Sequence, residues 1–252
     1  MDASLEELAE DTAVHLLPQP FFELVDRGSF CFEAGAHRGA VHRIRLGDVA
    51  AALEWSRAEA RRRKLTTVEW WVGWHATPTG LGRRLLDLGL VPDEPPSLTG
   101  MTCTSPPPGA PDVDVRPIET LDEQLTALEV DWEVWQLSAE ERAQRAGWER
   151  EHFEASHAAG ARRQFAAFLD GRCVGFGRGI DMEQGVALMG GAVLPEARGR
   201  GVYRALVRAR WDHAVRRGTP LLVVQAGPLS APILASLGFV AHGEISLYAD
   251  RL

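Results

Sequence analysis

The segment "AVLPEARGRGVYRALVRARWDHA" (Ala192–Ala214) joins an apolar stretch to a helix-forming stretch through a turn of alternating arginine and glycine. A helix N-terminus presents unpaired N–H groups and roughly half a positive charge, so an anion fits there. Glycines let the chain curl until successive N–H groups face one point. We therefore predict that the turn beginning at Arg198 binds an anionic ligand at the start of a helix.

Two well-known phosphate-binding loops do not fit this turn. The Walker A loop needs a Gly-Lys pair, and the chain contains none. The dinucleotide-binding fingerprint needs a third glycine, but Gly199-x-Gly201 is followed by Arg204 at that position. The turn therefore belongs to another class of anion-binding loop.

The pattern V-x-P-x-x-R-G-x-G from Val193 to Gly201 resembles the acyl-CoA-binding motif of the GNAT acyltransferase superfamily. The resemblance implies acetyl-CoA (CoA) as the ligand. It implies that Ala192, Val193 and Leu194 pair by backbone with the pantetheine arm, and that Ser230 contacts the same arm. It further implies that the phosphates are cradled by Arg198, Gly199, Arg200, Gly201, Val202 and Tyr203.

A proline-rich stretch, "TSPPPGAPDVD" (Thr104–Asp114), divides the chain, and each side of it carries a strand–turn–helix pattern. The patterns are "TVEWWVGWHATPTGLGRRLLDLGL" (67–90) and "LLVVQAGPLSAPILASLGF" (221–239), each with Ser or Thr as an expected helix N-cap. We expect an α/β (α+β) fold of two GNAT-like units, each a mixed, mostly antiparallel sheet flanked by helices. The expected boundaries are 1–104, a linker at 105–112, and 113–252.

The first repeat lacks the arginine–glycine turn. It passes from strand to helix through Leu46-Gly47-Asp48, and the Asp48 carboxylate would repel phosphate. We therefore predict that this repeat is degenerate and binds no CoA, and that it packs against or covers the active half.

The residues for acyl transfer are harder to assign. The resemblance implies a tyrosine as the proton donor to the leaving thiolate, but Leu234 occupies that position. The remaining candidates are Tyr203, Tyr248 and Glu133, with Glu141 and Glu154 as further carboxylates. The predicted function is an N-acetyltransferase acting on a small amine or amino-acid-like acceptor. The alternatives are a non-catalytic acyl-CoA-binding or regulatory protein, and a pure interaction protein.

Composition narrows the class further. The 252-residue chain carries a formal net charge of −8, which disfavours binding to nucleic acid or to anionic membranes. Its three cysteines lie far apart, without metal-ligand spacing, so we expect no metal site and a cytoplasmic location. The acidic N-terminus resembles neither a signal peptide nor a membrane span. Oligomeric state and acceptor identity are left open.

Local patterns give further expectations. Asp170-Gly171 is typical of a hairpin turn, and the Gly190-Gly191 pair of a β-bulge. Ser138 with Glu141 predicts a capping box, and Thr120 a helix cap. Trp132 and Trp135 are expected either in the core or as walls of a substrate pocket. His213 is expected to be packed against the apolar neighbours of its helix.

Overall fold

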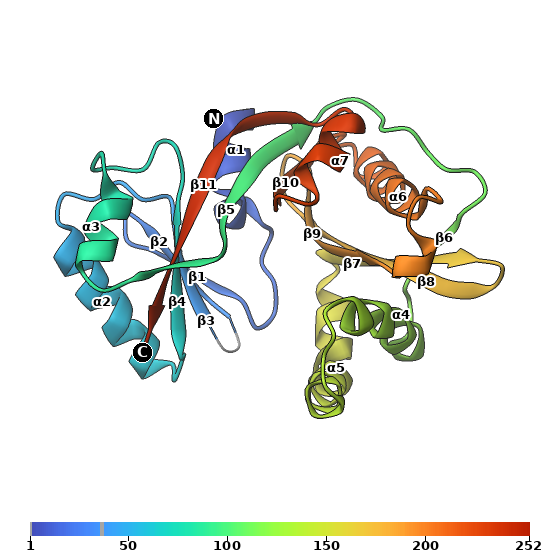
Figure 1. Ribbon diagram of the computed structural model, residues 1–252, viewed down its shortest axis with the longest axis horizontal. Coiled ribbons are helices and arrows are strands. Elements are labelled where there is room, and N and C mark those ends of the chain that lie inside the picture. The colour runs from blue at the N-terminus through green and yellow to red at the C-terminus, as the bar shows by residue number, and fades with distance from the viewer. Residues whose placement is uncertain (1, 36–37) are drawn as a thin grey trace. The chain divides into compact units, whose positions relative to one another are not determined.

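The computed structural model describes residues 2–35 and 38–252, which form two compact units (Figure 1). Unit 1 comprises the described residues up to Thr102 together with Val223–Leu252, and unit 2 comprises Cys103–Leu222. The last strands of the predicted second repeat, within Val223–Leu252, therefore pack with the first repeat in unit 1. The boundaries 1–104, 105–112 and 113–252 stay predictions about sequence repeats, because the compact units divide the chain differently.

Unit 1 is a mixed sheet whose strand order is β1-β2-β3-β4-β11-β5-β10. The pairings that join β1 to β3, and those of β11 with β4 and β5, are antiparallel, whereas β3 and β4 run parallel. Its elements are α1 (Leu5–Glu10), a 3-10 turn η1 (Thr12–His15), β1 (Glu23–Asp26), β2 (Cys31–Ala34), β3 (Arg38–His42), α2 (Val49–Arg62), β4 (Thr67–Val72), α3 (Leu81–Asp87), β5 (Val91–Cys103), β10 (Leu222–Ala226), α7 (Ala231–Ser236) and β11 (Val240–Arg251).

Unit 2 is an antiparallel sheet in the order β9-β8-β7-β6. Helix α6 covers one face of this sheet, and α4 and α5 lie on the other (Figure 1). Its elements are β6 (Asp114–Pro117), α4 (Leu121–Val134), α5 (Ala139–Ala159), β7 (Arg162–Leu169), β8 (Arg172–Asp181), β9 (Val186–Val193), a 3-10 turn η2 (Pro195–Ala197) and α6 (Val202–Arg216). The predicted α/β class, with mixed and mostly antiparallel sheets flanked by helices, is confirmed.

Most of the predicted local structure is present. Capping boxes at Thr120 and Ser138 begin α4 and α5. Asp170 and Gly171 both have positive φ, at 51° and 79°, and form the turn between β7 and β8. The register of β8 and β9 shifts between Gly177 and Gly179, which confirms a bulge at Gly190.

Three further local predictions have mixed outcomes. Trp135 follows the last turn of α4 and is 68% exposed, because α4 ends one residue earlier; Trp132 is buried as expected. Ser230 precedes α7 without capping it, since its Oγ donates instead to the carbonyl of Gly227. His213 is packed as expected, in edge contact with Phe165, and its Nε2 also lies 2.8 Å from the Asp181 carboxylate.

Residues 105–112 form neither helix nor strand and are largely exposed, although Pro107 is buried and its carbonyl accepts a hydrogen bond from Arg208. Within residues 2–35 and 38–252, no helix is both long and apolar enough to span a membrane. In the same ranges, no cluster of three or more His, Cys, Asp or Glu side chains could hold a metal ion.

Candidate functional site

The segment from β9 to α6 forms an exposed loop at a helix N-terminus. Pro195 begins the short 3-10 turn that ends β9, which fits its fixed φ and missing N–H. Gly199 and Gly201 then adopt φ of 76° and 84°, a left-handed conformation that strains other residues. The chain therefore turns sharply into α6, as the sequence predicts.

The main-chain donors of this loop are available to a ligand. The N–H of Arg198 donates to the carbonyl of Pro195. The main-chain N–H groups of the next three residues, Gly199, Arg200 and Gly201, have no hydrogen-bond acceptor in the described part of the chain. Gly199 and Arg200 are exposed. An added Cβ at Gly199 would meet no atom within 4 Å, so the space in front of the loop is open.

Three arginines surround these donors. Arg198 is anchored because its Nε donates to the carbonyl of Val193 at 3.3 Å. Arg200 is an exposed side chain whose only close acid is Asp170, at 3.5 Å in the described residues. The Arg204 guanidinium lies beside Gly201, 3.2 Å from the position of an added Cβ. Positive side chains and a helix N-terminus thus meet at one place, which favours a multiply charged anion.

The strand that leads into the loop carries the bulge. Residues Met189 and Gly190 both face Arg178 of β8, because the register shifts there, and Gly190 has a φ of 86°. Met189, Gly190 and Gly191 are exposed, whereas Ala192, Val193 and Leu194 are buried.

A buried arginine of α6 holds the bulge from beneath. Arg210 is 1% exposed, and its Nη1 donates to the carbonyls of Arg178 (3.2 Å) and Gly190 (3.3 Å). Gly177 leaves room for this guanidinium, since an added Cβ would lie 3.3 Å from its Cζ. Sequence reasoning did not assign Arg210 a role.

The two tyrosine candidates lie in different units. Tyr203, on the first turn of α6, packs beside Gly191, whose added Cβ would lie 3.4 Å from Tyr203 Cε2. Burial raises the pKa of the Tyr203 phenol, an effect that Arg210 partly opposes. Tyr248 belongs to β11 of unit 1, where it packs against the core and its hydroxyl lies under Gly82 of α3.

The other candidates are dispersed. Glu133 is an exposed residue of α4, in unit 2. Ser230 and Leu234 belong to unit 1, where Leu234 is completely buried in α7. Ala192–Leu194 and Arg198–Tyr203 therefore lie together on one segment of unit 2, whereas Tyr248, Ser230 and Leu234 belong to unit 1.

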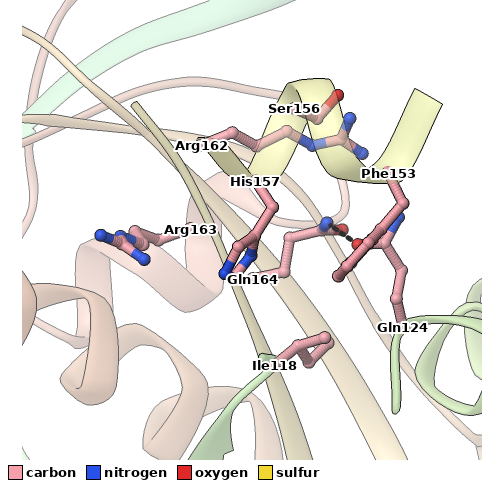
Figure 2. Close-up of a pocket in the computed structure, with 8 residues that line it drawn as sticks. All are labelled: Ile118, Gln124, Phe153, Ser156, His157, Arg162, Arg163 and Gln164. Carbon is pink, nitrogen blue, oxygen red and sulfur yellow. Dashed lines mark hydrogen bonds between the residues drawn. The ribbon is translucent and has the colours of Figure 1, made fainter. Parts of the chain in front are cut away.

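The opposite face of the unit 2 sheet carries a polar cluster that sequence reasoning missed. Arg162 and Gln164 of β7 point into a pocket beside the end of α5, where Gln164 donates to Gln124 of α4 (Figure 2). The available signal was a charged residue inside an apolar strand, as with Arg178 in "CVGFGRGI". The pocket is lined by Ile118, Gln124, Phe153, Ser156, His157, Arg162, Arg163 and Gln164.

Comparison with known proteins finds a family match for the second half of the sequence. The sequence model of the Acetyltransferase (GNAT) family matches residues 126–239. No curated protein is similar enough in sequence to match the chain.

Solved structures resemble the chain over nearly its whole length. A GCN5-related N-acetyltransferase from Kribbella flavida has a TM-score of 0.71 at 15% identity, covering 99% of this chain and 96% of that one. A tandem GNAT protein from the clavulanic acid biosynthesis pathway has a TM-score of 0.63 at 18% identity, with 99% and 88% coverage. Residues 126–239 therefore match the GNAT acetyltransferase family, in a chain that has the fold of tandem GNAT proteins.

Proposed function

We propose that the chain transfers an acetyl group from acetyl-CoA to the amine of a small molecule. The observation that carries this proposal is the exposed loop from Arg198 to Gly201. Its main-chain N–H groups at Gly199–Gly201 have no protein acceptor in the described residues, and arginines flank them. The diphosphate of CoA has the charge and the acceptor oxygens that such a loop binds.

The loop and β9 give the bound molecule a direction. We propose that Arg198–Tyr203 hold the phosphates and that the main chain of Ala192–Leu194 pairs with the pantetheine arm. Because the arm then runs back along β9, its acyl end points toward Gly191 and the bulge at Gly190. Acetyl-CoA supplies an acyl group activated as a thioester.

In the reaction the acceptor nitrogen bonds to the acyl carbon while the carbon–sulfur bond breaks. The nitrogen loses a proton, and the sulfur gains one. A main-chain N–H of β9 polarises the carbonyl oxygen. Tyr203 is the proton donor we propose, since it lies beside Gly191 and its raised pKa keeps the phenol protonated at neutral pH.

Unit 1 is proposed to bind no CoA. The corresponding helix, α2, begins at Asp48, whose carboxylate accepts a hydrogen bond from the main-chain N–H of Ala51. A negative side chain thus occupies the helix N-terminus where phosphate would bind.

A glutamate at Gly199 tests the loop directly. Position 199 has open space, so Gly199→Glu adds a negative charge without a clash. We expect the Kd for acetyl-CoA, measured by calorimetry, to rise at least about tenfold through repulsion of the phosphates. The matched control is Gly218→Glu at the other end of α6, where φ is 78° and the space is also open. Equal Kd values for the two variants would contradict the loop assignment.

One observation favours the non-catalytic alternative: Leu234, at the position where the resemblance implies a tyrosine, is fully buried and cannot donate a proton. Thiol release with acetyl-CoA and a panel of amines separates the two functions. Turnover that Tyr203→Phe reduces, with the Kd for acetyl-CoA unchanged, supports the enzyme. Tight acetyl-CoA binding without turnover on any amine supports the alternative.

A further inference from the structure

Three buried polar atoms without a hydrogen-bond partner gather on one face of unit 2. They are Arg162 Nε, Gln164 Oε1 and Arg178 Nε. Gln164 faces Arg178 across β7 and β8, and Arg162 lies two residues along β7, so all three side chains share one face of the sheet. Gln164 is only 9% exposed. Leaving such atoms unpaired is costly, so their concentration indicates a place built for a polar ligand.

The surrounding side chains hold this cluster in position. Gln164 Nε2 donates to Gln124 Oε1 at 2.5 Å, and Gln124 in turn donates to the carboxylate of Glu149. The other oxygen of Glu149 lies 3.7 Å from Arg162 Nη2. Glu149 therefore engages one end of the Arg162 guanidinium and leaves its Nε free. Figure 2 shows Arg162, Gln164 and Gln124 together at the pocket, with Arg163 pointing away.

The charges in this region favour an anion. Burial and, to a smaller extent, the neighbouring positive charge of Arg178 together lower the pKa of Arg162 to about 9, and the Glu149 carboxylate partly opposes this shift. The negative charges of Glu149 and Asp131 attract Arg178 and so partly offset the repulsion between Arg178 and Arg162. Neither carboxylate accepts a hydrogen bond from Arg178 Nε. A carboxylate that accepted one hydrogen bond from each arginine would pair both orphaned donors at once.

We propose that Arg162 and Arg178 form a subsite for a carboxylate, so that the acceptor is a small amine that also carries a carboxylate. This inference rests on the acetyltransferase function proposed above. Arg178 lies directly opposite the bulge at Met189 and Gly190. Neighbouring strands are about 4.8 Å apart, so the main chain of Arg178 lies one strand from the bulge toward which the acyl end is proposed to point.

The test uses matched pairs of amines with and without a carboxylate, such as L-phenylalanine with 2-phenylethylamine and β-alanine with ethylamine. For each pair, thiol release gives kcat/KM and calorimetry gives the Kd. We expect the native chain to prefer the carboxylate-bearing member at least about tenfold. Arg178→Gln should lower kcat/KM for that member about 10- to 100-fold, while the other member and the Kd for acetyl-CoA change less than about twofold.

Two variants complete the design. Arg178→Lys keeps the positive charge but loses the planar guanidinium, so its kcat/KM for the carboxylate-bearing amine should lie between those of the native chain and Arg178→Gln. If the glutamine variant does not fold, the lysine variant replaces it in the test. Arg116→Gln alters an exposed arginine of β6 in the same unit and should leave the preference intact.

The outcomes separate this inference from the proposed function. Carboxylate-dependent binding that Arg178→Gln abolishes supports the subsite even if no thiol is released. Equal use of both members by the native chain overturns it, as does an equal loss for both in Arg178→Gln. Failure of every carboxylate-bearing amine to bind or react also overturns it, whereas turnover of amines without a carboxylate preserves the acetyltransferase function.

Discussion

Arg210 is a single side chain that compensates for an irregularity in the sheet. A β-bulge disrupts the ladder and leaves main-chain groups without strand partners. The guanidinium of Arg210 reaches across the glycines of β8 and donates to the carbonyls of Arg178 and Gly190, while its Nε donates to Leu206 in its own helix. The position of the bulge therefore depends on a residue two helical turns beyond the loop.

Arg210→Ala should therefore destabilise unit 2. Two buried carbonyls lose their donor, so we expect the free energy of unfolding to fall by about 3 kcal/mol. The control is Arg216→Ala, an exposed residue of the same helix, with an expected change within about 0.5 kcal/mol. Urea unfolding monitored by tryptophan fluorescence measures both. Similar stabilities for the two variants would show that Arg210 does not hold the bulge.

At the level of elements, helices α6 and α2, which follow the strand in the second and first repeat respectively, differ in how their N-termini are capped. Helix α6 begins after Gly201, and no side chain of the described residues caps its first N–H groups. Helix α2 begins at Asp48, which caps its own helix. We propose that the N-terminus of α6 receives an external anion, whereas that of α2 is already capped by the protein.

Asp48→Ala tests this contrast. Removing the cap should lower the free energy of unfolding by about 1 kcal/mol and leave the Kd for acetyl-CoA unchanged. Thermal unfolding and calorimetry measure the two effects. A weakened Kd would mean that the N-terminus of α2 takes part in CoA binding.

The elements also show what the sequence could and could not predict. The strand–glycine–helix pattern of residues 192–214 predicts its own conformation because proline and glycine restrict or free the backbone locally. Thr120 and Ser138 predict helix starts for the same local reason. The roles of Arg162, Arg178 and Arg210 were not predictable, because each depends on residues brought near by strand pairing. Helical spacing left the place of Trp135 open between core and pocket wall, and the residue is exposed because α4 ends just before it.

On the scale of the whole chain, the final strand of the second repeat completes the first unit. Strand β11 lies between β4 and β5, with Tyr248 opposite Trp70. Arg57 of α2 forms a two-pronged ion pair with Asp250, at 2.8 and 3.0 Å. The sequence repeats alone could not predict this exchange, since local patterns do not specify which partner a strand selects.

Truncation after Phe239 should therefore unfold unit 1, although it removes only residues of the second repeat. Without β11, the strands β4 and β5 lose their shared partner. We expect amide exchange in β4 and β5 to lose its protection, with Asp250→Asn in the full-length chain as a milder control. Native protection in the truncated chain would mean that the first repeat folds without β11.

The central claim, that the glycine–arginine loop holds the diphosphate of CoA, is tested most directly by amide hydrogen exchange with and without CoA. The account predicts one CoA per chain, with slowed exchange at Gly199, Arg200 and Gly201 and no change at residues 47–50. Protection at residues 47–50 instead, or CoA binding that leaves the loop exchanging at its free rate, would contradict it.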